Sequence, residues 1–319
     1  MKAFVAWNPN REVVLKSTSG GVFSALAESV IASGGLVVGA VYSEGLSIRH
    51  AVAETLEDMA PMRGVKYAFG VISKGVYDRI ASALSDGRHV LFTGTPCQCA
   101  AMRKRFASDA NLLLVDLVCF GAPPQSLWLK YVRWLEARKR KRLVSVNPRD
   151  KKHGWGRKTY YSYQWADGRV SRQLSLFDPY AQVFYSTLGF RKCCFSCPFR
   201  GKNHPSDLTL GDGWGYETQD LPGVIKRNGL SLVACHNSRG LAVLESCGCK
   251  IFPIDESIIH AHNRPYFESP LLHKRWAEFN TDVTCLEFGA LAKKYGLTHV
   301  RAEWLACRLK NLFKKILGR

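Results

Sequence analysis

The chain has 319 residues, 46% of them hydrophobic, which suffices for a substantial core in one large domain or a domain with an appendage. Eleven cysteines are too dilute for a disulfide scaffold, and the N-terminal residues lack the features of a signal peptide, so we expect a protein of the reducing cytoplasm. No apolar run has the length of a membrane span, and the formal net charge of +19 favours acidic partners.

Short apolar runs alternate with helical patterns through the first half of the chain. The expected strands are residues 2–7, 36–42, 89–95 and 112–119, and the expected helices are residues 21–32, 74–84 and 97–106. This alternation predicts an α/β core with a substantially parallel sheet.

The second half adds other elements. A helical segment at 125–141 ends in basic residues, and two strand-like runs, 159–165 and 169–176, flank Ala166, Asp167 and Gly168 as in a hairpin. Residues 193–229 are rich in Gly, Pro, Asn, Asp and Cys, which predicts a long irregular loop before a strand at 230–235 and a helix at 238–245. We therefore expect a mixed, partly parallel sheet with flanking helices and an inserted antiparallel hairpin over residues 1–275, followed by a basic amphipathic helical tail over 276–319.

The cysteines give the sharpest local signal. Cys194 and Cys197 form a C-x-x-C pair before a proline, and their thiolates can converge on one metal. Cys97 follows one predicted strand and Cys119 ends another, and the carboxyl ends of neighbouring parallel strands share one crevice. Four thiolates there would suit a 4Fe-4S cluster or zinc. The alternatives to these ligands are neighbouring cysteines, Cys99 and Cys193, and the other cysteines are expected to be inert small hydrophobes.

Two glycine-containing elements are candidate anion sites. The residues Ser17, Thr18, Ser19, Gly20 and Gly21 precede an apolar helix, where hydroxyls and backbone amides can approach a phosphate, although ordinary helix capping explains the same residues. The run Thr93, Gly94, Thr95 and Pro96 joins a strand to a helix, where open α/β sheets bind ligands and where tight turns also occur.

Taken together, the motifs resemble the coenzyme F420 hydrogenase/dehydrogenase beta-subunit family over roughly residues 3–260. The matching elements, in chain order, are Ser17 to Phe23, Lys66 and Tyr67, Val90 to Gln98, Asp116 to Cys119, Arg149 to Lys151, Gly154 and Trp155, Cys194 to Phe199, and Asp207 to Asp212 with Trp214 and Gly215. The matches occur in the same order as in the family.

The resemblance implies an FAD and one 4Fe-4S cluster. Cys97, Cys119, Cys194 and Cys197 are similar to the cluster ligands. The residues similar to the flavin-contacting set are Ser17, Thr18, Ser19, Gly20, Gly21, Lys66, Tyr67, Thr93, Gly94, Thr95, Arg149, Asp150 and Lys151. The catalytic residues are unknown.

Three positions depart from the family pattern. Phe120 replaces the histidine that usually follows the cysteine of the Asp-Leu-Val-Cys motif, so a proton relay by that histidine is absent. Phe69 and Gly70 replace an amide and a hydroxyl residue, which changes the expected contacts to the flavin ring. Many bacterial relatives also begin with a ferredoxin-like segment, which this sequence does not show, so we expect a separate acidic electron carrier, either ferredoxin or reduced coenzyme F420.

The resemblance thus implies a flavin- and iron-sulfur-dependent oxidoreductase whose acceptor is unidentified; similar bacterial proteins look like accessory reductases of surface-polysaccharide pathways. Two alternatives remain open. One is a zinc-stabilised basic nucleic-acid-binding protein, which the Arg138 to Arg142 run would suit. The other is a cofactor-free scaffold of the same fold.

The last segment carries a further prediction. Leu305, Leu309, Leu312 and Ile316 fall on one helical stripe beside basic residues, as in a helix that lies on an anionic membrane surface at the inner face. A terminal helix packed on the protein's own core would show the same pattern.

Overall fold

The computed structural model describes residues 1–107, 109–156, 158–216, 221 and 227–297. The larger of two sheets has eight strands in the order β11-β1-β10-β9-β5-β4-β2-β3. Its strands, in chain order, are β1 (Lys2–Trp7), β2 (Leu36–Tyr42), β3 (Ile48–Ala53), β4 (Val90–Gly94), β5 (Leu112–Leu117), β9 (Leu208–Asp212), β10 (Ser231–Cys235) and β11 (Lys250–Ile254).

This sheet is mixed, as expected. The pairs β2–β4, β4–β5 and β5–β9 are parallel, whereas β1 runs antiparallel to both of its neighbours and β3 runs antiparallel to β2. The strand β9 was missed because its short Leu-Thr-Leu-Gly-Asp run lies among turn-forming residues, in the segment expected to be an irregular loop. It is a central strand, and its pairing with β5 and β10 joins the two halves of the sheet.

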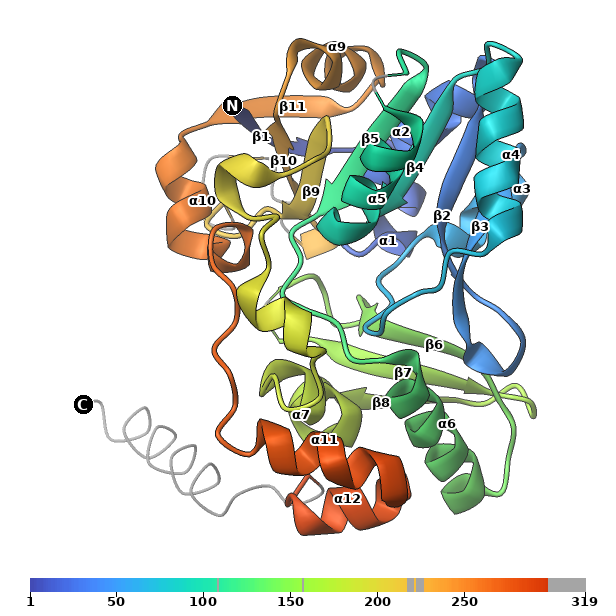
Figure 1. Ribbon diagram of the computed structural model, residues 1–319, viewed down its shortest axis with the longest axis vertical. Coiled ribbons are helices and arrows are strands. Elements are labelled where there is room, and N and C mark those ends of the chain that lie inside the picture. Colours follow the sequence, from blue (N-terminus) through green and yellow to red (C-terminus); the bar gives the residue numbers. More distant parts are fainter. Residues whose placement is uncertain (108, 157, 217–220, 222–226, 298–319) are drawn as a thin grey trace.

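Helices cover both faces of the large sheet (Figure 1). One core contains Leu26 of α2 and Leu244 of α9, and the opposite core contains Ile80 of α4 and Met102 of α5. The helices of this layer are α1 (Arg11–Lys16), α2 (Val22–Ala32), α3 (Leu56–Met59), α4 (Lys74–Ser85), α5 (Pro96–Phe106), α9 (Ser238–Ser246) and α10 (Glu256–His262).

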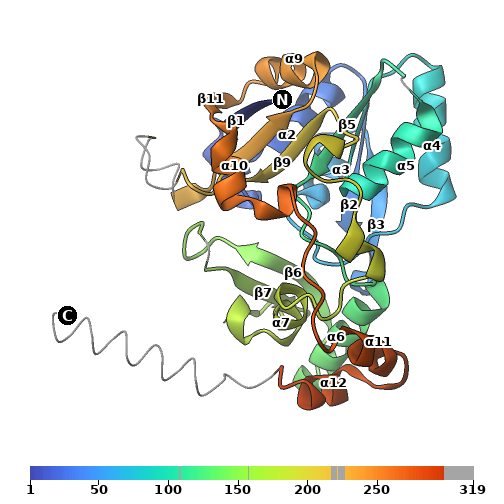
Figure 2. The ribbon, with the colours of Figure 1, turned by 60° about the vertical axis from the view of Figure 1, so that its left-hand side comes forward.

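A second, smaller layer lies below the first in Figures 1 and 2. It holds an antiparallel sheet, β6 (Leu143–Asp150), β7 (Tyr160–Trp165) and β8 (Val170–Leu174), with the helices α6 (Gln125–Lys139), α7 (Pro179–Tyr185), α11 (Trp276–Cys285) and α12 (Phe288–Lys294). The predicted hairpin is β7–β8. The layers are joined through β5 to α6 and through the short 3-10 helix η4 (Lys192–Ser196).

The C-terminal helices that the structure describes pack with this smaller layer. Phe279, Phe288 and Leu291 are buried beside Trp128 and Tyr131 in one hydrophobic core. The division at residue 275 stays a prediction, and the membrane-binding stripe from Leu305 to Ile316 lies outside the described residues. Within the described ranges, no helix is long and apolar enough to cross a bilayer.

Candidate functional site

A small cavity of about 100 Å³ lies where β4, β5 and η4 meet. It is lined by Cys97, Cys119, Cys193, Cys194 and Cys197. Parallel pairing of β4 with β5 sets Gly94 opposite Asp116, so the chain leaves both strands at the same edge of the sheet. Cys97 lies in the first turn of α5 after β4, and Cys119 follows β5 by two residues. The C-x-x-C segment lies against both.

The cysteines that the sequence left as alternatives are placed differently. Cys193 is exposed but also lines the cavity, whereas Cys194 is buried. Cys99 does not line this cavity; its thiol points into the core beneath α5 and donates to the Val115 carbonyl at 3.6 Å. The structure therefore removes Cys99 from the candidate ligands and keeps Cys193.

Two of the cavity thiols, Cys119 and Cys194, are desolvated. Burial raises the pKa of Cys119 to about 12, Arg200 opposes this, and the neighbouring Cys194, Cys97 and Cys197 raise it further. Burial likewise raises the pKa of Cys194, and Arg191 opposes it. Thiolates at Cys97, Cys119, Cys194 and Cys197 would repel one another, and a bound cationic centre would stabilise all four in the deprotonated form.

Two arginines in the cavity wall were missed in the sequence. The Nη1 group of Arg200 donates to the carbonyls of Cys119 and Pro265, and Arg191 stacks 3.6 Å from the ring centre of Phe69. The Nε groups of Arg191 and Arg200 are buried and have no hydrogen-bond partner among the described residues. Arg191 precedes Cys194 by three residues and Arg200 follows Cys197 by three. This proximity in sequence could have identified both arginines.

A larger cavity of about 510 Å³ opens between the loop after α1 and strand β6. Its lining includes three residues of the expected flavin set, Ser17, Thr18 and Lys66, together with Arg63 and Asn147, which the sequence did not single out. The Thr18 hydroxyl is buried without a hydrogen-bond partner in the described structure. An unsatisfied buried hydroxyl is costly unless a ligand meets it.

Lys66 stabilises the backbone turn that forms part of the wall of this cavity. Its Nζ lies 3.0 to 3.1 Å from the carbonyls of Pro61, Met62, Arg63 and Gly64. Burial lowers the pKa of Lys66 to about 7, whereas the surrounding carbonyls favour the protonated form. Lys66 therefore holds the turn that faces the loop from Ser17 to Gly21.

The glycines of that loop have backbone roles. The Gly20 amide donates to Ser231 Oγ at 2.9 Å, and a Cβ on Gly20 would lie 2.4 Å from the Ala6 carbonyl oxygen. Gly21 has φ of +82° and forms the N-cap of α2, which no side chain caps. Only glycine fits the first position, and glycine is favoured at the second.

Beside this loop lies an ion-paired cluster. Arg149 makes two contacts of 3.1 and 3.2 Å with Asp212, and the Ser19 hydroxyl donates to the same carboxylate. Lys151 donates to the Ser19 carbonyl at 2.6 Å, so it fixes the loop backbone. Burial lowers the pKa of Lys151 to about 7, and Asp212 opposes this shift. Asp150 is not part of the cluster, because its carboxylate accepts from Arg172 of β8.

Two further residues of the expected flavin set, Tyr67 and Thr95, lie toward the cysteines. Tyr67 packs 4.3 Å from the Phe184 ring, within the aromatic cluster that contains Cys194. Burial raises the pKa of Tyr67, and nearby Arg149 opposes this. Thr95 lines the cysteine cavity and caps α5 through a capping box with Gln98, whereas the described lining of the larger cavity includes none of Thr93, Gly94 and Thr95.

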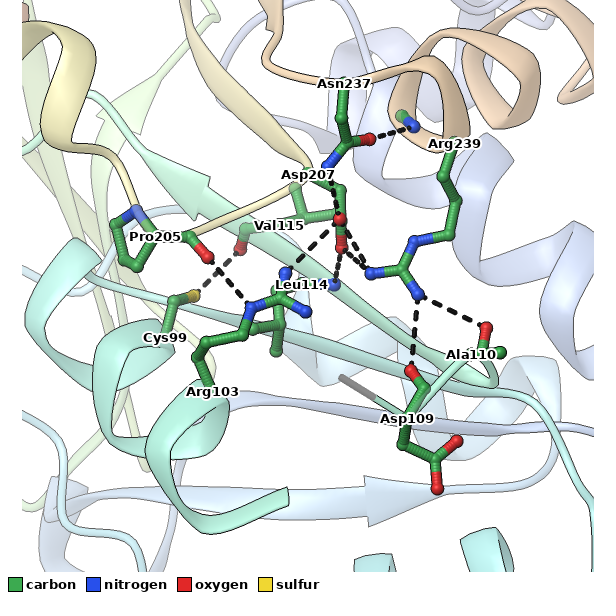
Figure 3. A network of polar contacts seen from close by, with 11 residues as sticks. Cys99, Arg103, Asp109, Ala110, Leu114, Val115, Pro205, Asp207, Asn237 and Arg239 are labelled. Atoms are coloured by element: carbon green, nitrogen blue, oxygen red, sulfur yellow. Dashed lines mark hydrogen bonds and ion pairs between the residues drawn. The ribbon is translucent and has the colours of Figure 1, made fainter. Parts of the chain in front are cut away.

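Asp207 is the centre of a network of polar contacts that joins several elements (Figure 3). Its buried carboxylate accepts hydrogen bonds from Arg103 of α5, from the Leu114 amide of β5, and from Asn237 and Arg239, the N-cap and second residue of α9. The Asp-Leu-Thr-Leu-Gly-Asp motif therefore begins with a structural carboxylate and ends with Asp212 at the Arg149 cluster. Asp207 fixes α5, β5 and α9 relative to one another.

Comparisons with known proteins identify the family and the fold of the chain. The family model for the C terminus of the coenzyme F420 hydrogenase/dehydrogenase beta subunit matches residues 87–251, slightly more than half of the chain. A chain in the xenon-derivatised F420-reducing NiFe hydrogenase complex from Methanosarcina barkeri has a similar fold, with a TM-score of 0.53 and 16% identity over 80% of this chain and 83% of that one. No curated protein matches. The chain belongs to the coenzyme F420 hydrogenase/dehydrogenase beta-subunit family.

Proposed function

We propose that this protein is an oxidoreductase that binds FAD and one 4Fe-4S cluster and passes electrons between a reduced carrier, coenzyme F420 or ferredoxin, and a second acceptor. The observation that carries the proposal is the convergence of Cys97, Cys119, Cys194 and Cys197 on one cavity. Four cysteine thiolates are the usual ligand set of such a cluster. Membership of a hydrogenase/dehydrogenase family supports a redox role.

The cavity chemistry fits a cluster. Burial and neighbouring thiols raise the pKa values of Cys119 and Cys194, and a cationic iron centre would displace the protons of the ligating thiols on binding. Arg191 and Arg200 would offset the net negative charge of a cluster with four thiolates. Their Nε groups have no hydrogen-bond partner among the described residues, so they could donate to the sulfur atoms of the cluster. Cys193 is the competing ligand for the position of Cys194.

The larger cavity supports flavin binding. Its volume of about 510 Å³ lies within the range of small-molecule pockets, about 300 to 1,000 Å³. The unpartnered Thr18 hydroxyl, the uncapped N-terminus of α2 nearby and the cationic Lys16 and Arg63 in the wall suit a pyrophosphate.

Tyr67 supports a connection between the two cavities, because it follows Lys66 of the larger cavity and packs against the hydrophobic residues around Cys194. A bound FAD would exchange electron pairs with a hydride donor, and a cluster would carry single electrons. The residues of this chain would hold the two groups close to each other and exclude water between them. Roles in surface-polysaccharide synthesis and residence in the cytoplasm stay predictions.

The test is anaerobic purification followed by quantification of iron, acid-labile sulfide, zinc and flavin. We expect four irons, four sulfides and one FAD per chain. Stoichiometric zinc without colour would favour the zinc-stabilised alternative, and a protein with neither metal nor flavin would favour a cofactor-free scaffold. Reduction of the bound flavin by reduced coenzyme F420 or by reduced ferredoxin then identifies the donor.

A further inference from the structure

An exposed surface of mixed apolar and basic character lies beside the cysteine cavity. We call it the rim surface and define it by exposed residues of η4, of the following turn and of the linker before α11: Lys192, Cys193, Lys202, Leu271, Leu272 and Lys274. Cys193 belongs both to this surface and to the lining of the cavity. The rim surface therefore adjoins the cavity at Cys193.

Hydrogen bonds hold the linker against the cysteine turn. The Cys197 amide donates to Ser269 Oγ at 3.1 Å, and Thr187 Oγ1 donates to the Leu271 carbonyl at 2.8 Å. Trp276, the first residue of α11, anchors the C-terminal end of the linker. Its Nε1 donates to the Phe190 carbonyl at 2.7 Å, and its ring centre lies 5.7 Å from that of Phe195. The backbone of the linker is thus fixed, and its leucine side chains are presented in a defined position.

Those leucines are unusually exposed. Leu271 is 81% exposed and Leu272 is 59% exposed, more than any other large hydrophobic side chain that the structure describes. Adjacent exposed apolar side chains with a charged surround are typical of a protein interface, in which an apolar centre is bordered by polar residues.

The charged surround is basic. Lys192 precedes the cysteine turn, Lys202 follows Cys197 by five residues, and Lys274 follows the leucines by two residues. Within the described chain none of these three ammonium groups has a carboxylate at ion-pair distance. Their charge is therefore available to a partner and adds to the overall +19 of the chain.

We propose that the rim surface docks a small acidic one-electron carrier protein, which seats an apolar patch on Leu271 and Leu272 and carboxylates on the lysines. The proposal rests on the proposed function, because the electron would pass to a cluster held by the four cysteines. In that step the carrier is oxidised by one electron and the cluster is reduced by one electron, and no proton or bond is transferred. Electrostatic steering speeds such encounters, and the apolar pair sets the seated position.

The experiment is anaerobic rapid mixing of the full-length protein, loaded with its cluster, with a reduced acidic 2Fe-2S ferredoxin as the probe. One variant carries Leu271→Ser and Leu272→Ser, and another carries Lys192→Glu and Lys274→Glu. The matched controls are Leu56→Ser, which changes a leucine that is 52% exposed on α3, and the pair Lys104→Glu and Lys250→Glu, which changes exposed lysines of α5 and β11.

We expect each rim variant to lower the second-order rate of electron transfer by about ten-fold at low salt, and the lysine variant to flatten its salt dependence. Both controls should stay near the parent rate, and reduction by dithionite should be equal in all proteins. A loaded protein whose rim variants accept electrons at the parent rate would overturn the docking proposal alone. A protein that binds no iron or sulfide would overturn the proposed function, and the docking proposal with it.

Discussion

The hydroxyl of Thr95 lies 3.1 Å from the sulfur of Cys97, although the same hydroxyl also lies 3.1 Å from Gln98 Oε1. The Gln98 oxygen already accepts from the Thr95 amide at 2.9 Å. A metal-bound thiolate is the stronger acceptor, so we expect the hydroxyl proton to point to Cys97 when the site is loaded.

The first prediction follows from this contact. Thr95→Val keeps the shape of the side chain and removes the donor, so the reduction potential of the cluster should fall, since hydrogen bonds to ligand sulfur raise it. Loss of the helix cap should also destabilise the protein by about 1 kcal/mol. Redox titration followed by electron paramagnetic resonance measures the potential. The control is Thr95→Ser, which retains the hydroxyl; an equal potential in both variants would show that the contact does not act on the cluster.

The second prediction separates two adjacent cysteines. Cys194→Ser should lose most of the iron and sulfide, because Cys194 is buried in the cavity wall, and Cys193→Ser should keep them, because Cys193 is exposed. Iron and sulfide analysis of anaerobically purified variants measures this. The reverse result would exchange the two residues in the ligand set and leave the cavity assignment intact.

The third prediction concerns flavin retention. Thr18→Val replaces an unpartnered buried hydroxyl by an isosteric methyl group, so the fold should be as stable as before while FAD binding weakens by about 1 to 3 kcal/mol. Equilibrium dialysis of FAD with the flavin-free protein provides the measurement. Gly20 is unsuitable for this test, since any side chain there would collide with β1. If Thr18→Val binds FAD with the parent affinity, the phosphates lie elsewhere.

The fourth prediction concerns the buried carboxylate of Asp207. Asp207→Asn should cost about 3 to 5 kcal/mol in the free energy of unfolding, because it leaves Arg103 and Arg239 without their buried partner. Burial raises the pKa of Asp207, but hydrogen bonds from Arg239 and the Leu114 amide outweigh it and hold the pKa below its usual value. Urea unfolding measures the loss. Asp109→Asn, a change outside this ion pair, is the control and should be nearly neutral.

The fifth prediction concerns acid stability. His50 is buried against the Phe92 ring, and its burial lowers its pKa from 6.5 to about 4. The unfolded chain binds more protons between these values, so stability should decrease as the pH falls from about 6.5 to about 4, by up to about 3 kcal/mol. His50→Gln should lose that part of the slope. The slope is measured from urea unfolding at several pH values; an unchanged slope in the variant would assign it to another group, such as His236, whose pKa burial also lowers to about 4.

The sequence by itself determined the local elements and the chemical types at the site. The spacing of apolar residues and the flanking glycines predicted the ends of β1, β2, β4, β5 and α2 to within about two residues. This was possible because the burial of a strand face or of one side of a helix is encoded in the local sequence. The strand ends after β4 and β5 already indicated that Cys97 and Cys119 would meet, since parallel neighbours share an edge.

Tertiary structure decided what locally similar residues do. It showed that Cys99 and Cys193 differ as candidate ligands. The thiol of Cys99, on helix α5, lies in the hydrophobic core, whereas Cys193 lies on η4 and lines the cavity. It showed that Gly20 lies where two backbone segments distant in sequence approach each other closely. It also showed that the Lys66 ammonium group donates to the backbone carbonyls of the turn before it. It also made β9 a central strand, because pairing with β5 and β10 supplies hydrogen bonds that no local pattern records.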